Sequence, residues 1–266
     1  MIDIHSHAIF DVDNGSRSLE QSIKMIKMAK SVGFEAICFT PHYDNERNVL
    51  TRKELLEKIL KIKNELTKNR INMHLYLGEE VSIFPNMPDK MHKVISLNDT
   101  RYVLLTFTKE DDITYLEELV DSMISMGKVP VLAYPERYER FRSNKQELIK
   151  LVKRGALLQV NANSLTGQYG TDVEAFTKEL LEKDLVSFVA SDAHSVAGYY
   201  KARKGFEALR RLVGEEKFKL LTKTNPCRAL ADIKIDMNEG AKKEHLNRDK
   251  MIVKFFKTFP ILERML

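Results

Sequence analysis

Residues 1–15 read MIDIHSHAIFDVDNG and place two histidines, His5 and His7, at the end of an apolar segment. The IDIH portion, residues 2–5, predicts a short β-strand. Because alternate residues of a strand point to one face, the two imidazoles point together if the strand continues through them. A His-x-His pair alone is a weak signal, but two imidazoles on one face are well placed to hold a cation.

Outward from this segment, short apolar runs alternate with longer stretches whose apolar residues recur at helical spacing. The strands are predicted at residues 2–5, 35–40, 72–78, 101–107, 129–134, 156–161 and 186–192. The helices are predicted at residues 18–33, 51–69, 113–127, 143–155 and 172–184, with further helices to about residue 222. This alternation predicts a single α/β domain with parallel strands, and the number of repeats favours a closed (β/α) barrel over an open sheet.

Three of the predicted helices carry end signals. Gly33 is expected to be a C-cap. Thr51 is expected to be an N-cap, with Glu54 in the capping-box position three residues later. Ser143 is expected to cap the helix that follows it.

Composition sets limits on the class of protein. The chain has 266 residues, of which 43% are hydrophobic and 30% charged, as in an ordinary globular protein. It has no apolar run long enough to span a membrane, and its start lacks the features of a signal peptide. Two cysteines do not make a disulfide framework. These features predict a cytoplasmic enzyme, and the interleaved charges with a net +5 do not indicate nucleic-acid binding.

Polar residues follow five of the predicted strands. In a parallel barrel, active sites gather where the strands end at their carboxyl-terminal rim. A purely structural protein has little reason to place such side chains there. The residues at these strand ends are His5, His7, His42, Glu79, Glu80, Tyr134, Glu136, Arg137, Asp192 and His194.

The first and last strands of a barrel are neighbours, which would bring His5 and His7 close to Asp192 and His194. Imidazoles together with carboxylates suit zinc, manganese or iron better than calcium or magnesium. A bound metal would lower the pKa of a water and polarise a phosphoryl or acyl oxygen. The remaining histidines, His74, His92 and His245, are expected to be structural or surface residues.

Six segments in series, MIDIHSH, TPHY, GEEV, LNDTRYVLL, PVLAYPER and FVASDAH, resemble the polymerase-and-histidinol-phosphatase (PHP) superfamily. The closest resemblance is to the metal-dependent bacterial protein-tyrosine phosphatases of capsule and exopolysaccharide operons, from residue 1 to about residue 230. The resemblance implies a distorted (β/α)7 TIM-like barrel over residues 1–234. It also implies three metal ions, manganese or iron (zinc being an alternative), and hydrolysis of phosphotyrosine on a membrane-associated, autophosphorylating tyrosine kinase.

The resemblance implies specific ligands. The first metal would be held by His5, His7, Glu80 and Asp192, and the second by His42 and His194. The remaining ligand of the second metal is an aspartate in the family but Asn14 here, and an amide oxygen is an uncharged, weaker ligand. The third metal shares Glu80 and would use a glutamate and a histidine, where this chain has Thr106 and Tyr134.

The resemblance also implies two phosphate-binding arginines. The first matches Arg137 in the PER segment. The second falls near Tyr199, where this chain has Lys201 and Arg203 just beyond. Two bound ions and a degraded third site are therefore expected. Residual hydrolase activity is favoured over a weakened protein that only binds metal and phosphotyrosine. An alternative is that Thr106 and Tyr134 are ordinary core substitutions in a site that never needed a third ion.

The sequence also bears on three other classes of function. A cysteine-dependent tyrosine phosphatase needs Cys-x5-Arg, but Asp44 and Ile233 stand six residues after Cys38 and Cys227, so both cysteines are expected in the core or at a cap. A histidinol-phosphate phosphatase shares the ligands, although LNDTRY and PER favour the capsule group. A non-enzymatic binding module is the third alternative.

Residues 235–266 are expected to form a tail outside the barrel. Residues 242–257 carry six Lys or Arg against two acids, and the apolar segment FFKTFPILERML follows at 255–266. The tail either packs on the barrel wall or offers a basic, apolar contact for the kinase or the inner membrane face. Pro260 argues against a long membrane helix. The oligomeric state is left open.

Overall fold

The computed structural model describes residues 1–44, 50–107 and 113–235. Within these ranges the strands are short and buried. They are β1 (Ile2–Ser6), β2 (Ala36–Phe39), β3 (His42–Tyr43), β4 (His74–Leu77), β5 (Glu80–Ser82), β6 (Tyr102–Thr106), β7 (Val129–Ala133), β8 (Leu157–Asn161) and β9 (Val186–Ala190).

The helices alternate with the strands along the chain, as predicted. They are α1 (Leu19–Val32), α2 (Arg52–Lys68), α3 (Ile113–Ser125), α4 (Glu139–Ser143), α5 (Lys145–Lys153), α6 (Thr171–Glu182), α7 (Val196–Lys219) and α8 (Asn225–Leu230). Short 3-10 helices at Pro88–Lys93, Leu97–Asp99, Pro135–Arg137 and Ala162–Thr166, and a π-helical turn at Leu220–Thr224, complete the described elements.

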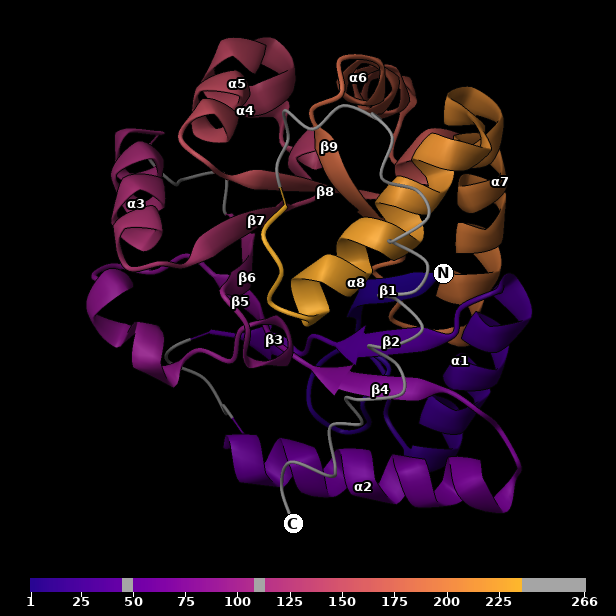
Figure 1. The fold of residues 1–266 in the computed structure, drawn as a ribbon. Coiled ribbons are helices and arrows are strands. Elements are labelled where there is room, and N and C mark those ends of the chain that lie inside the picture. Colours follow the sequence, from indigo (N-terminus) through magenta and orange to yellow (C-terminus); the bar gives the residue numbers. More distant parts are fainter. Residues whose placement is uncertain (45–49, 108–112, 236–266) are drawn as a thin grey trace.

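All strand pairs are parallel. One sheet has the order β1-β2-β4 and the other β3-β5-β6-β7-β8-β9. The ends of the two sheets meet where Ser6 bridges Ala193, and the His7 N–H donates to the Ala193 carbonyl at 3.1 Å. The strands therefore form a ring with helices outside it (Figure 1). This is the α/β, TIM-like barrel that the sequence predicts.

Two very short strands were not predicted. His42–Tyr43 and Glu80–Ser82 continue the second and third predicted strands after an interruption. Pro41 supplies no N–H donor before β3. A Cβ on Gly78 would lie 2.9 Å from Leu97 Cδ2, so the backbone approaches Leu97 closely before β5. These interruptions divide the ring into two sheets and distort the barrel.

The apolar core has two parts. One fills the interior of the ring and includes Ile4, Tyr76, Leu104 and Phe188. The other lies between the strands and the surrounding helices. Cys38 and Cys227 are both buried free thiols, which confirms the expectation that they are core residues.

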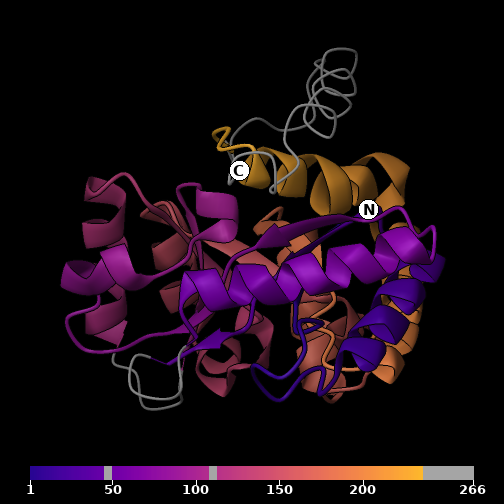
Figure 2. The same ribbon diagram turned by 90° about the horizontal axis from the view of Figure 1, so that it is seen from below.

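The helix α8 covers one end of the ring of strands. Gly214 has φ +75° and kinks α7, a conformation that a residue with a Cβ adopts at a cost. After this kink the chain crosses the ring of strands as α8, which contacts β1 and β9 (Figures 1 and 2). Leu230 of α8 is buried in the interior core. The polar residues predicted at the carboxyl-terminal ends of the strands lie at the opposite end of the ring.

Two of the three predicted helix ends are confirmed. Gly33 is a left-handed C-cap with φ +107°. Thr51 and Glu54 form the complete capping box of α2. The Ser143 prediction was wrong, because Ser143 ends the unpredicted helix α4 and Asn144 precedes α5 without a side-chain cap hydrogen bond.

The described chain continues to Ile235, which is 9% exposed and whose N–H donates to the Tyr102 hydroxyl at 3.0 Å. The rest of the predicted tail, including His245, lies outside the described residues. Of the other two histidines, His74 is half-buried on β4 and His92 is exposed. The helices that the structure describes include none that is both long and apolar enough for a bilayer.

Candidate metal centre

Four of the predicted ligands converge at the carboxyl-terminal rim. The ligand atoms of His5, His7, Glu80 and Asp192 all lie within 4.8 Å of one another. Glu80 Oε2 is 3.2 Å from the Nε2 atoms of both histidines, and Asp192 Oδ1 is 3.5 Å from both. Three separate parts of the chain, β1, β5 and the turn after β9, therefore surround one small volume.

A second group shares His7 with the first. His7, His42 and His194 also place ligand atoms within 4.8 Å of one another. His42 Nδ1 lies 3.0 Å from Glu80 Oε2, and the rings of His7 and His194 stack with centroids 3.8 Å apart. We refer to the two groups together as the rim cluster, which consists of His5, His7, His42, Glu80, Asp192 and His194.

The orientation of His5 is fixed by a residue that the sequence did not indicate. His5 Nδ1 lies 2.7 Å from Gln159 Oε1, and Gln159 Nε2 donates to the Val160 carbonyl at 2.9 Å. The glutamine oxygen is therefore an acceptor, and His5 Nδ1 must donate to it. This leaves the lone pair of His5 Nε2 directed at the two carboxylates, as a metal ligand requires.

Asp13 orients the His7 imidazole in the same way, and the sequence did not indicate this role either. Its Oδ2 atom lies 2.7 Å from His7 Nδ1 and accepts the His42 N–H at 3.2 Å. A Cβ on Gly15 would lie 2.1 Å from the His7 carbonyl oxygen, so only glycine allows this turn. The only sequence signal was the DVDNG segment itself. Asn14, the predicted weak ligand, is exposed at this turn, and its role stays a prediction.

The rim cluster fits a divalent cation. The His5 Nε2, His7 Nε2 and Glu80 Oε2 atoms are buried and have no hydrogen-bond partner. Buried polar atoms in proteins are normally paired, and a shared cation would satisfy all three. Imidazoles with carboxylates are a ligand set for zinc, manganese or iron.

The electrostatics of the rim cluster agree with this fit. Burial raises the pKa of Glu80, but the neighbouring imidazoles of His5, His42 and His7 outweigh burial and hold that pKa well below its ordinary value. Burial lowers the pKa of His7, but Asp13, Asp192 and Glu80 outweigh it and hold it well above its ordinary value. A cation therefore competes with protons for these imidazoles.

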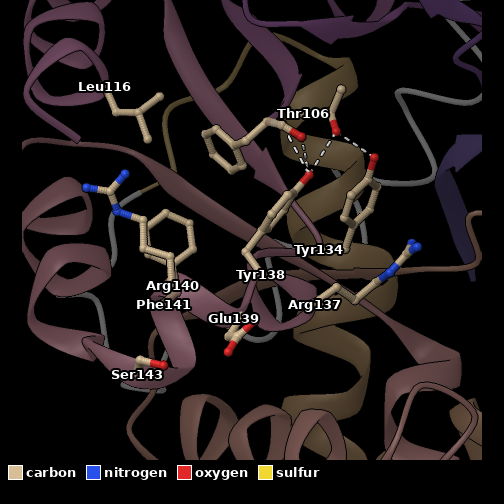
Figure 3. Close-up of a pocket in the computed structure, with 10 residues that line it drawn as sticks. Thr106, Leu116, Tyr134, Arg137, Tyr138, Glu139, Arg140, Phe141 and Ser143 are labelled. Carbon is tan, nitrogen blue, oxygen red and sulfur yellow. Dashed lines mark hydrogen bonds between the residues drawn. The ribbon is translucent and has the colours of Figure 1, made fainter. Parts of the chain in front are cut away.

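The residues at the third position do not fit another ion. The Tyr134 hydroxyl makes a short hydrogen bond to Glu80 Oε1 and lies 2.5 Å from Thr106 Oγ1. Thr106 Oγ1 is also 3.0 Å from the Tyr138 hydroxyl (Figure 3). Burial beside the Glu80 carboxylate raises the pKa of Tyr134, so its hydroxyl stays protonated. The second oxygen of Glu80 thus accepts a hydrogen bond from the neutral Tyr134 hydroxyl, which in turn contacts Thr106.

Arg137 lies at the edge of the rim cluster. Its Nη1 atom is 3.3 Å from Asp192 Oδ2, and its guanidinium lies over the rings of Tyr134 and Tyr169 at 4.5 and 4.6 Å. The side chain is 36% exposed. Neighbouring Glu136 is buried and instead accepts hydrogen bonds from the Asn161 N–H and the Ser164 hydroxyl.

Lys201 and Arg203, the other predicted phosphate-binding residues, are on α7. Both are exposed on α7, and Arg203 packs over the Tyr200 ring at 5.2 Å. The buried face of α7 carries Tyr199, whose hydroxyl bonds Ser6 and Asp3. The ion pairs within the described chain join neither Lys201 nor Arg203 to the rim cluster.

A parallel α/β barrel whose strands end in converging imidazoles and carboxylates is typical of metal-dependent hydrolases. Residues 1–231 match the family model for capsular polysaccharide synthesis, CpsB/CapC, so the chain belongs to the CpsB/CapC family. This confirms the family that the sequence motifs indicated.

Two curated relatives are about one third identical to the chain over the aligned residues. The tyrosine-protein phosphatase YwqE of Bacillus subtilis (strain 168) is 35% identical over 198 residues, which are 74% of this chain and 78% of the relative. The putative tyrosine-protein phosphatase CapC of Staphylococcus aureus is 31% identical over the same lengths.

Solved structures agree with the fold. A chain from the crystal structures of YwqE from Bacillus subtilis and CpsB from Streptococcus pneumoniae, described as unique metal-dependent tyrosine phosphatases, matches with a TM-score of 0.81 and 32% identity. The match covers 89% of this chain and 96% of that one. A histidinol phosphate phosphatase from Lactococcus lactis shares the fold, with a TM-score of 0.54, 16% identity and coverage of 83% and 94%.

Proposed function

We propose that the chain is a metal-dependent protein-tyrosine phosphatase, a phosphoric monoester hydrolase. One observation carries the proposal. The unpartnered atoms His5 Nε2, His7 Nε2 and Glu80 Oε2 converge beside the guanidinium of Arg137, in a chain 35% identical to a tyrosine-protein phosphatase. Ligands for a metal ion therefore lie beside a positively charged side chain that can bind a phosphate.

In this proposal the rim cluster holds two ions. His5, His7, Glu80 and Asp192 ligate one, and His42 and His194 ligate the other, with His7 between the two groups. Manganese is the proposed metal, with iron or zinc as alternatives. When bound, the ions supply Lewis-acid activation of water and of the phosphoryl group. Asp13 and Gln159 hold the imidazoles of His7 and His5 in the ligating orientation.

Arg137 is the proposed phosphate-binding side chain. A guanidinium can bond two phosphoryl oxygens at once and offset the charge that develops on them during transfer. The rings of Tyr134 and Tyr169 pack against the guanidinium at the edge of the cluster. Arg137 is preferred for this role because it contacts Asp192 of the rim cluster, whereas Lys201 and Arg203 are exposed on α7 and no described ion pair joins them to the cluster.

The proposed substrate is a phosphotyrosine protein in the cytoplasm. A membrane-associated, autophosphorylating tyrosine kinase of capsule or exopolysaccharide synthesis is the proposed partner. The family's description supports the link to capsular polysaccharide synthesis. The altered residues Asn14, Thr106 and Tyr134 are compatible with a slower enzyme, because two ligands of a third ion are missing.

The test compares three substrates with the manganese-loaded protein. We expect phosphate release from a phosphotyrosine peptide to exceed release from the matching phosphoserine peptide and from histidinol phosphate. His5→Ala should abolish release, whereas His92→Ala, on the exposed surface, should not change it. Faster release from histidinol phosphate would favour a small-molecule phosphatase. No release from any substrate by metal-loaded protein would favour the weakened binding protein.

A further inference from the structure

A cavity of about 710 Å³ opens directly beside the rim cluster. Thr106, Tyr134 and Arg137 line the side nearest the cluster, and α3 and α4 contribute Leu116 and Phe141 (Figure 3). Tyr134 contacts both the cluster and the cavity. Its hydroxyl bonds Glu80 of the cluster, while Tyr138, also in the cavity wall, stacks with its ring at 5.9 Å.

Much of the cavity wall is aromatic. Phe107, Tyr138 and Phe141 pack edge to face, with ring centroids 5.2 to 6.2 Å apart and interplanar angles of 76 to 81°. The hydroxyl of Tyr138 already contacts Thr106 and the main-chain N–H and carbonyl of Phe107. These groups therefore offer the cavity ring faces and edges, which favour a flat apolar ligand.

The position of the cavity matches the shape of an aryl phosphate. In phosphotyrosine a single ester oxygen separates the phosphorus from the ring, so a phosphate at the rim cluster requires space for a ring immediately beside it. Tyr134 and Arg137 border both the cluster and the cavity. We propose that this cavity binds the aryl ring of the substrate, and this proposal rests on the proposed phosphatase function.

The volume of the cavity exceeds that of one benzene ring and falls in the range of sites that enclose larger organic ligands. It therefore has room for a bicyclic ring, or for the tyrosine ring together with part of the adjoining peptide. The largest ring that the cavity accepts can be measured from the affinities of phosphonates that carry different groups. Narrowing the cavity should reduce the affinity for the larger rings.

Binding of phosphonates, which are not hydrolysed, tests the proposal without catalysis. Calorimetry would measure the Kd of methylphosphonate, n-hexylphosphonate and 2-naphthylphosphonate for the manganese-loaded full chain. We expect the naphthyl compound to bind at least tenfold more tightly than the methyl compound and more tightly than the hexyl compound. Leu116→Trp, which fills the cavity, should reduce the naphthyl preference at least fivefold and leave methylphosphonate binding unchanged.

A second variant covers the case in which Leu116→Trp does not fold, because Leu116 is only 3% exposed. Ser143 is an exposed cavity residue at the end of α4, and Ser143→Trp should also reduce the preference. Ser125→Trp is its matched control, since Ser125 is an exposed residue at the end of α3 that does not line the cavity. It should keep the wild-type preference.

Three results would overturn the aryl assignment: no naphthyl preference in the wild type, equal binding of the hexyl compound, or an unchanged preference in the folded tryptophan variants. The phosphatase proposal fails separately, if the wild type releases no phosphate from a phosphotyrosine peptide. A wild type that hydrolyses this peptide without any naphthyl preference would refute the aryl site alone.

Discussion

The Nδ1 atom of His7 lies 2.7 Å from Oδ2 of Asp13, and this contact determines which nitrogen of His7 faces the rim cluster. The carboxylate accepts the Nδ1 proton and leaves Nε2 directed at Glu80 and Asp192. Such a carboxylate raises the basicity of the ligand and fixes its tautomer. Asp13 is therefore expected to control metal affinity without contacting the metal.

Asp13→Asn should weaken manganese binding by roughly 10- to 100-fold, the usual effect of removing such a partner. Calorimetric titration of the metal-free protein would measure it. Asp11→Asn in the same loop is the control, because Asp11 is exposed and its positive φ of 53° suits asparagine equally well. Equal manganese affinity of the Asp13 variant and the wild type would show that this contact does not determine metal binding.

Thr106→Glu combined with Tyr134→His should raise the bound manganese from two to three ions per chain and increase phosphatase rate. The change replaces two hydroxyls around Glu80 with ligands. Tyr134 has φ 38°, a left-handed conformation that histidine adopts more readily than most residues. Elemental analysis and rate assays would measure both effects.

Tyr134→Phe is the control for this double change, because it removes the hydroxyl without adding a ligand. Its metal content should stay at two ions. If the double variant binds no extra metal and gains no rate, the third site is not what limits this enzyme.

Arg137→Lys should lower kcat/KM for a phosphotyrosine peptide by about tenfold or more, since losing a transition-state contact of about 1.4 kcal/mol costs that factor. Lysine keeps the charge but cannot bond two oxygens in the same plane. The melting temperature and metal content should barely change. Arg154→Lys is the control, because Arg154 is exposed and does not line the cavity. A variant that keeps its rate but loses stability would make Arg137 a scaffold residue.

Glu136→Gln should change how stability depends on pH. Burial, opposed by hydrogen bonds from Ser164 and Asn161, raises the pKa of Glu136 from 4.5 to about 7 in the folded protein. Between these pH values the folded chain retains a proton that the unfolded chain loses, so the free energy of unfolding falls as pH rises through this range.

The glutamine variant lacks this titration. Its free energy of unfolding, relative to wild type, should therefore increase by about 2–3 kcal/mol between pH 5 and pH 8, at 1.36 kcal/mol per pKa unit. Urea unfolding of both metal-free proteins at these pH values would measure the difference. A difference that does not vary with pH would show that Glu136 does not titrate in this range.

Local sequence signals predicted the alternating elements well, because each buried strand and helix carries its own apolar pattern. Short strands such as β3, with two residues, carry too little pattern. The Ser143 cap was wrong because the neighbouring helix α4 was not recognised. Capping and turn signals are reliable only when the adjoining element is known.

The candidate site was predictable where residues follow strands, as His42 and Glu80 do. Gln159 was not, because its contact with His5 joins residues 154 positions apart and glutamine carries no metal signal. Lys201 and Arg203 were expected near the phosphate from family spacing alone. Both are exposed on α7, whose buried face carries Ala202 and Phe206, and their phosphate-binding role stays a prediction.

The most direct test of the account is phosphate release from a phosphotyrosine peptide, measured as a function of the manganese bound per chain. The metal-free protein should release no phosphate, and the rate should rise to a plateau when two ions are bound at the rim cluster. Phosphate release by the metal-free protein, or no release from protein that carries two manganese ions, would contradict the account.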